Sequence, residues 1–211
     1  MVQRLKIASL CKQMKTKHLL FTGSLTAIVF WLSTIIAGFI HGNYNHFSNT
    51  VSELGALGTK SQTFMMVTIT GCGLLSLMFM VGLYRACKVL GANTLPVYTV
   101  ISMPIMFFWV SAFPAGTKLH ATLGSVILLL YLGMLISVFV WRGSQYLQIR
   151  VLSVVSFLML AALFLRMVPS IDNNYPGLIQ RVAHLGWSVW LVSLNVSFVQ
   201  LLNLKDLKFS K

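Results

Sequence analysis

The feature that most constrains this chain is a series of apolar runs, each about as long as a membrane is thick. Every run holds roughly 20 residues, enough for a helix to cross a hydrocarbon layer of about 30 Å. Lipid offers no partners for backbone N–H and C=O groups, so each run must form a helix. We therefore predict an all-α fold, a polytopic six-helix transmembrane bundle. The predicted spans are residues 19–40, 63–84, 94–113, 121–141, 151–168 and 184–202.

Composition excludes the competing classes of protein. Hydrophobic residues make up 57% of the chain and charged residues only 9%, whereas a soluble domain carries about 25% charged residues. A transmembrane β-barrel would show segments of about ten residues with alternating polarity, and the apolar runs do not alternate. The three cysteines have no metal-site spacing and indicate no disulfide framework. A protein embedded in membrane lipid is the class that remains.

The positive charge predicts the topology. The formal net charge is +13, and twelve of the 16 Lys and Arg residues lie in segments that the predicted spans place on one side. Cytoplasmic loops carry such an excess, so we predict cytoplasmic N- and C-termini. The predicted organisation is a basic cytoplasmic arm (1–18), a six-span transmembrane domain (19–203) and a basic cytoplasmic tail (204–211). Because this charge flanks apolar runs, it indicates topology signals and contact with anionic lipid, and it excludes nucleic acid as a partner.

One loop, residues 43–58, reads NYNHFSNTVSELGALG and gathers polar side chains between two spans. Its Glu53 is one of only three acidic residues in the chain. The stretch from Thr50 to Glu53 matches a capping box, in which Glu53 would bond the amide that begins a short helix. The functional alternative is a carboxylate at the membrane boundary. Either apolar surroundings raise its pKa, or it forms an ion pair with Arg181 or Arg166. Both interpretations remain open at this point.

Titratable side chains collect on the predicted outer side, which the topology rule does not explain. His120 and His184 each begin a span, and Arg181 lies three residues before His184 on the same helical face. We predict that they converge with Glu53 in an outward-facing polar pocket at the level of lipid head groups. Glu53, His120 and His184 are the candidate catalytic residues, and Arg181 is the candidate anion anchor. The other candidate binding residues are Tyr44, His46, Ser52 and Arg166.

Two other chemistries are weaker hypotheses. A zinc site from His46, Glu53, His120 and His184 is chemically allowable, but their scattered spacing lacks any H-E-x-x-H pattern. We therefore predict no metal site, and no motif indicates a cofactor. Ser52 could act as a nucleophile beside His46, yet it does not lie in a G-x-S-x-G turn.

Three segments together carry a family resemblance: NYNHFSNTVSELGALG, FPAGTKLHATLG and GLIQRVAHLGWSVW. They resemble the motifs of the domain-of-unknown-function 998 family of bacterial and archaeal membrane proteins. The resemblance implies six spans in the cytoplasmic (inner) membrane of a prokaryote and no assigned chemistry. This chain departs from the family in the short, acid-free loop between Pro114 and His120. The Ser-Glu-Leu-Gly loop is also similar, over a short stretch, to that of the FRAG/DRAM/Sfk membrane proteins, some of which are tied to lipid remodelling.

The leading functional hypothesis is a multi-pass membrane protein whose outward-facing pocket binds or processes a lipid or other amphiphile. Whether it is an enzyme stays open. The alternatives are a small proton-coupled transporter and a non-enzymatic membrane scaffold, whose partner would be a second copy of the chain or another membrane protein. The inner halves of the spans lack ionisable groups, which argues against a charged relay and therefore against transport.

Overall fold

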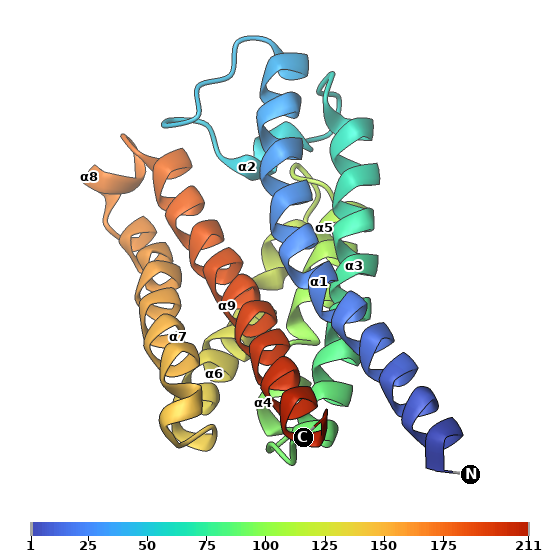
Figure 1. The fold of residues 1–211 in the computed structure, drawn as a ribbon. Helices are drawn as coiled ribbons and strands as arrows, with labels where there is room; N and C mark the ends of the chain where they lie inside the picture. Colours follow the sequence, from blue (N-terminus) through green and yellow to red (C-terminus); the bar gives the residue numbers. More distant parts are fainter. Residues whose placement is uncertain (1, 211) are drawn as a thin grey trace.

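The computed structural model describes residues 2–210, with side chains described for residues 14–207 except at positions 121 and 123–125. The regular structure of the described residues is all helical, and the long helices lie side by side in one bundle (Figure 1). The α-helices are α1 (Val2–His41), α2 (Val51–Leu54), α3 (Gln62–Leu90), α4 (Leu95–Thr99), α5 (Ser102–Ala112), α6 (Gly124–Val140), α7 (Leu147–Leu160), α8 (Pro169–Asp172) and α9 (Pro176–Ser210). The 3-10 helices are η1 (His120–Leu123), η2 (Ser144–Tyr146) and η3 (Ala161–Met167).

Within the described residues, five segments are long and apolar enough to cross a membrane. They are Met14–His41, Gln62–Leu90, Leu95–Ala112, Ser144–Met167 and Pro176–Leu207. The other long apolar helix, α6, has 17 residues, and at 1.5 Å per residue it reaches only about 25 Å. The predicted all-α transmembrane bundle is confirmed, and the sixth crossing stays a prediction.

Several predicted spans differ from the observed helices, and the last two show the physical reasons most clearly. The last span, predicted over 184–202, lies inside the longer α9, which begins at Pro176 because proline at a first helical position needs no amide partner. The fifth, predicted over 151–168, changes from α-helix to the tighter 3-10 helix η3 at Ala161.

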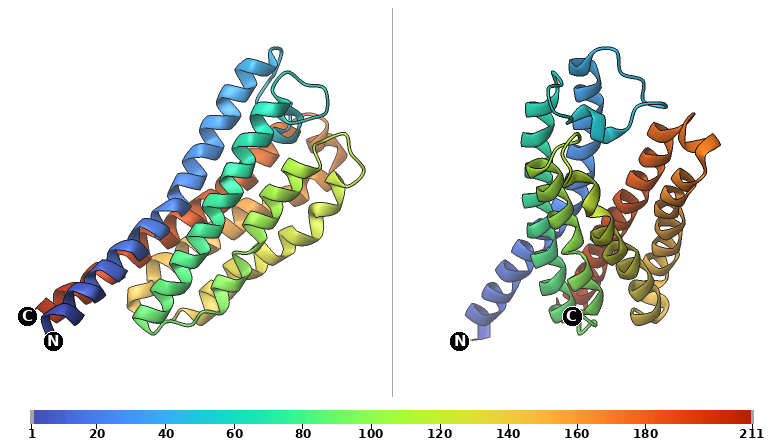
Figure 2. Two further views of the ribbon diagram at one scale, coloured as in Figure 1. Left: turned by 90° about the vertical axis from the view of Figure 1, so that its right-hand side faces the viewer. Right: turned by 180° about the vertical axis from the view of Figure 1, so that it is seen from behind.

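Both termini lie at the same end of the bundle, as Figures 1 and 2 show. The opposite end, which we call the distal end, carries the loop from α1 to α3, the loop from α5 to η1 and the helix α8. The loops predicted to share the outer side therefore do lie at one end. The assignment of that end to the cell exterior stays a prediction.

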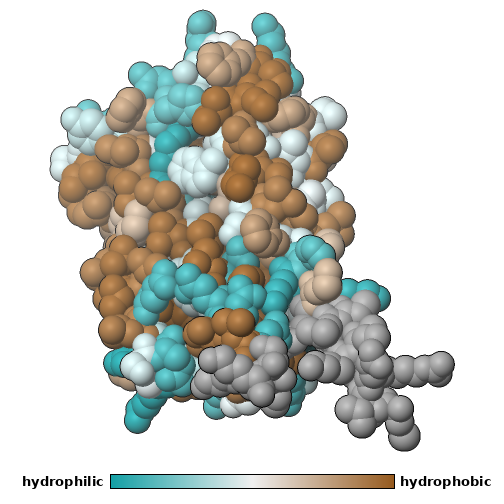
Figure 3. Space-filling view, in the orientation of Figure 1, coloured by the Kyte–Doolittle hydropathy of each residue, from teal (hydrophilic) through white to brown (hydrophobic). Residues whose placement is uncertain are grey.

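The outward faces of the helices are apolar, as lipid contact requires. Large hydrophobic side chains are exposed along the bundle, for example Phe39 at 82% and Val67 at 68%. Figure 3 shows brown apolar side chains over the middle of this face and hydrophilic ones toward its two ends. Exposed apolar surface on this scale marks a membrane-facing protein.

The last helix, α9, is the centre of the bundle. In its most apolar stretch 61% of the residues are buried, against 22–44% in the other four spanning segments. Trp187 and Trp190 are almost completely buried on it. Asn195 donates a hydrogen bond to Ser24 of α1 at 2.6 Å, and the Trp190 indole donates to Ser153 of α7 at 3.1 Å. Such interhelical bonds hold membrane helices where lipid supplies no hydrophobic drive.

Two glycines of α3 make a matched test of helix packing. A Cβ at Gly82 would lie 2.8 Å from the backbone of Leu19 and Leu20 in α1, whereas a Cβ at Gly71 would meet nothing within 4 Å. We predict that Gly82→Ala lowers the free energy of unfolding by about 1–3 kcal/mol, because the two backbones must separate. Gly71→Ala should leave it within about 0.5 kcal/mol. Unfolding in mixed micelles measures both, and equal stability of the two variants would contradict this close approach.

Candidate functional site

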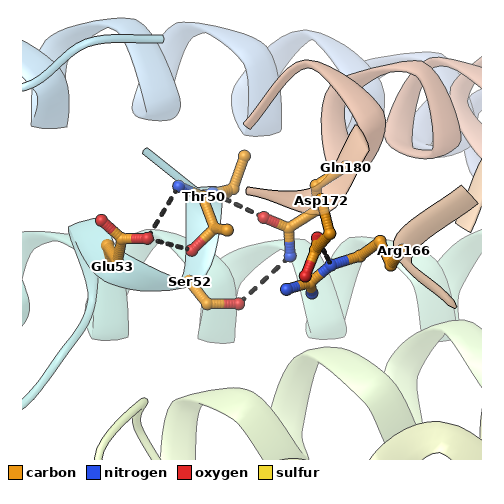
Figure 4. Close-up of polar contacts among 7 residues, drawn as sticks. Thr50, Ser52, Glu53, Arg166, Asp172 and Gln180 are labelled. Atoms are coloured by element: carbon orange, nitrogen blue, oxygen red, sulfur yellow. Dashed lines mark hydrogen bonds and ion pairs between the residues drawn. The ribbon is translucent and has the colours of Figure 1, made fainter. Parts of the chain in front are cut away.

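A short helix and its cap organise the loop between α1 and α3. The Glu53 carboxylate accepts hydrogen bonds from the Thr50 amide at 3.0 Å and the Thr50 hydroxyl at 2.8 Å (Figure 4). It also accepts one from the Asn49 side chain at 2.6 Å. The predicted capping box is therefore confirmed. In this arrangement Glu53 orders the turn that begins α2.

Arg181, near the start of α9, holds the first half of this loop. Its guanidinium donates to the Asn49 carbonyl at 3.0 Å and to the Tyr44 hydroxyl at 2.7 Å. It also donates to Nδ1 of His46 at 2.8 Å and to the His46 carbonyl. A further bond at 3.0 Å ties it to the Gly177 carbonyl of its own helix. These acceptors are uncharged, so Arg181 binds the loop as a fork of donors and not as the partner of a carboxylate.

The preceding residue, Gln180, fastens the second half of the loop. Its Oε1 accepts a hydrogen bond from the Val51 amide at 2.6 Å, and its Nε2 donates to the Ser52 hydroxyl at 3.2 Å (Figure 4). Gly177 permits this contact, because a Cβ there would lie 2.3 Å from the Asn49 carbonyl oxygen. The loop therefore rests directly on the first turns of α9. We call these contacts the loop anchor: Tyr44, His46, Asn49, Thr50, Glu53, Gln180 and Arg181.

Burial and the Arg181 charge set the protonation states in the loop anchor. Burial raises the pKa of Tyr44, and the hydrogen bond and charge of Arg181 offset that rise only in part. Burial lowers the pKa of His46, and the Arg181 charge lowers it further. His46 is therefore neutral at neutral pH and presents the Nδ1 lone pair that Arg181 uses.

Glu53 is held as an anion. Burial alone would raise the pKa of its carboxyl. The hydrogen bonds from Thr50 and Asn49, helped by the nearby His41, outweigh burial and hold the pKa below its usual value. A general acid needs a raised pKa, so these surroundings suit a structural anion better than a proton donor.

A cavity of about 300 Å³ lies beside the loop anchor. Its walls come mainly from α3, α5 and α9, with smaller contributions from α1, η1, α6, α7 and η3, and on one side from α2 through Val51 and Ser52. Most of the lining is apolar, and methionine thioethers with three rotatable bonds let it adapt in shape. The methionines are Met65, Met66, Met103 and Met106, and the aromatic residues are Phe30, Phe107 and Trp187.

Two histidines and one arginine give the cavity its polar character. Nδ1 of His120 lies 2.9 Å from the Phe113 carbonyl oxygen, and Nδ1 of His184 accepts the indole N–H of Trp187 at 2.9 Å. Both imidazoles are thereby fixed by protein groups. Ser111, Ser52 and Gln180 add hydroxyl and amide groups to the same lining.

The charged group of the cavity is at its edge. Arg166 donates to Asp172 at 2.8 Å, which neutralises its charge locally (Figure 4). Its side chain is 42% exposed, so this residue belongs both to the cavity lining and to the protein surface.

The structure divides the predicted site residues between two neighbouring places. The loop anchor takes Tyr44, His46, Glu53 and Arg181, whereas His120, His184 and Arg166 line the cavity. Ser52 belongs to both, because it bonds Gln180 and also lines the cavity. The expected convergence of all these groups in one pocket is thus replaced by a pocket and an adjoining anchor. The catalytic roles suggested for Glu53, His120 and His184 stay predictions.

Sequence reasoning missed residues of both places. Gln180 and Gly177 lie within the segment GLIQR, which marks the family resemblance but carries no chemical signal of its own. Met66 and Met106 of the cavity could not be predicted either, because the sequence pattern around a methionine that faces a cavity is the same as around one that faces lipid.

Metal chemistry gains no site from the described residues. Among them, no group of three or more His, Cys, Asp or Glu side chains could hold a metal ion. The zinc set considered from the sequence is divided, with His46 and Glu53 in the loop anchor and His120 and His184 in the cavity.

Comparison with known proteins places most of the chain in one family. A family model described as "Protein of unknown function (DUF998)" matches residues 24–197, which includes the loop anchor and the cavity. Neither a curated protein nor a solved structure matches the chain.

The loop anchor makes a prediction for Arg181. Arg181→Lys keeps the charge but cannot reach the same acceptors, so we expect docking to weaken by about 2–3 kcal/mol. Backbone amides of residues 43–50 should then exchange hydrogen roughly 30- to 150-fold faster. Arg142→Lys is the control, because the Arg142 Nε donates only to the nearby Phe139 carbonyl and the residue is exposed. Unchanged exchange in Arg181→Lys would show that the loop does not depend on this side chain.

The same contacts predict that acid loosens the loop. The pKa of His46 is lowered in the folded chain, so docking is complete above the ordinary imidazole value of about 6.5 and weakens as pH falls through the lowered value. The pKa of Glu53 is also lowered, so its contribution acts in the same direction at lower pH. Hydrogen exchange corrected for its intrinsic pH dependence measures this. His46→Gln keeps an acceptor that does not titrate, so this variant should lose the weakening of docking that His46 protonation causes. Docking that tightens in acid would refute the role given to His46 and Glu53.

Proposed function

The chain belongs to the family of proteins of unknown function DUF998, and we propose that it binds a single-chain amphiphile in the cavity beside the loop anchor. The observation that carries the proposal is the composition of this cavity. Apolar side chains line most of it, methionines and aromatic rings among them, and His120, His184 and Arg166 supply polar contacts. Apolar walls with a few placed polar groups are the general pattern of small-molecule sites.

The size of the cavity limits the ligand. A volume of about 300 Å³ is at the lower end of the range for small-molecule pockets. One acyl or prenyl chain with a small head group fits this range better than a two-chain phospholipid. Arg166 lines the cavity and is partly exposed, which supports access for a ligand from the surface beside it.

The location of the cavity supports contact with lipid head groups. Its polar residues come from the distal end of the bundle, which also carries α2 and α8. We propose that this end faces outward from the cytoplasmic membrane of a prokaryote. The excess of Lys and Arg in the segments at the other end supports that orientation.

Binding explains the geometry better than catalysis does. A serine nucleophile needs a base within hydrogen-bond reach, whereas the described partner of the Ser52 hydroxyl is the amide of Gln180. The nearest candidate base in sequence, His46, uses its Nδ1 to accept from Arg181. In this proposal Glu53 and Arg181 act indirectly, by holding α2 as one wall of the cavity.

Blocking the cavity tests the proposal. We predict that Met106→Trp, which fills the cavity, reduces the amphiphile that co-purifies with the chain by about tenfold or more, since a filled site loses most of its apolar contact. Met78→Trp is the matched control, because Met78 lies on α3 with 45% of its surface exposed to the lipid side. Native mass spectrometry of the purified protein measures retention. Equal retention in both variants would refute binding in this cavity.

A further inference from the structure

The two histidines of the cavity both leave Nε2 without a protein partner, but the two Nε2 atoms differ in protonation, and this difference limits the ligand class. His184 Nδ1 lies 2.9 Å from the Trp187 indole nitrogen, which can only donate. Nδ1 of His184 must therefore hold a lone pair. The proton of the neutral ring is on Nε2, which makes Nε2 a hydrogen-bond donor.

His120 has the opposite arrangement. Its Nδ1 lies 2.9 Å from the Phe113 carbonyl oxygen, which can only accept. Nδ1 of His120 must therefore carry a proton, and in the neutral ring Nε2 holds the lone pair. Among the described residues, neither Nε2 has a protein hydrogen-bond partner, and both rings line the same cavity. With His120 neutral, the two histidines of the lining thus supply one donor and one acceptor.

The charge of the lining argues for an uncharged head group. Arg166 is the permanently charged residue among those that line the cavity, and Asp172 pairs with it at 2.8 Å. A carboxylate would have no proton for the His120 acceptor, and an ammonium would have no lone pair for the His184 donor. A hydroxyl has both.

We propose that the ligand is an uncharged amphiphile with a hydroxyl head group, such as a long-chain alcohol or a monoacylglycerol. A hydroxyl donates to Nε2 of His120 and accepts from Nε2 of His184, either through one oxygen or through two neighbouring ones of a polyol. The apolar chain lies against the methionines and aromatic rings. This inference rests on the proposed function, because it names the ligand of the same cavity.

Three matched photoreactive probes test the inference on the full chain in lipid nanodiscs. They share one alkyl chain with a diazirine and differ only in the head: an alcohol, its methyl ether and the corresponding fatty acid. Labelling of cavity-lining peptides is quantified against probe concentration by mass spectrometry. We expect the alcohol to label them at about tenfold lower concentration than the ether or the acid, the effect of one well-formed hydrogen bond.

Variants separate the two nitrogen atoms. His120→Phe removes the acceptor, so it should weaken alcohol labelling to the level of the ether and leave the ether unchanged. His184→Phe removes the donor, so it should weaken both probes, since each has an oxygen that accepts. His18→Phe, at an exposed position on α1 away from the cavity, is the control and should change neither.

The outcomes distinguish this inference from the proposed function. Cavity labelling by all three probes at equal concentrations, or tighter labelling by the fatty acid, would overturn the hydroxyl assignment and leave amphiphile binding intact. Labelling by none of them in the cavity would overturn both. The comparison of the probes on the unmodified chain needs no variant, so a misfolded substitution does not weaken it.

Discussion

The distal end of this protein depends on one partly buried cation, Arg181, whose described partners include no carboxylate. Arg181 would be costly inside a membrane helix if its donors were unsatisfied, and backbone carbonyls of the loop satisfy them. A carbonyl can meet a guanidinium donor only if the loop folds back onto α9. The same bonds therefore satisfy the charge and fix the path of the chain between α1 and α3.

The cavity follows from that path. Because the loop is held at the start of α9, the adjoining helix α2 becomes a wall of the cavity, through Val51 and Ser52. Most of its other walls belong to the long helices, which interhelical contacts already hold. The polar groups of the loop anchor bond one another, whereas the cavity is mostly apolar and has imidazole nitrogen atoms without a described protein partner at His120 and His184. One site thus orders the protein, and the other remains available to a ligand.

The features that the sequence predicts correctly depend on residues close together in the chain. Apolar run length identified the spanning helices, and Thr50 followed three residues later by Glu53 identified the cap. The partners of Arg181 could not be predicted. Every residue has a backbone carbonyl, and which of them reaches the guanidinium depends on how the loop folds. The sequence also showed that His120 and His184 share one end of the bundle, but only the fold decides that Arg181 does not line the cavity with them.

The most direct test of the account is whether Arg181 holds the loop on α9 in a membrane. The Leu178 amide donates to the Phe47 carbonyl at 3.0 Å, and both side chains are exposed. Cysteines at these two positions, with the three native cysteines replaced by alanine, report the contact through a short bifunctional thiol reagent. The account predicts rapid cross-linking that slows by about tenfold or more when Arg181 is changed to Ala. Absent cross-linking, or a rate unaffected by Arg181→Ala, would contradict it.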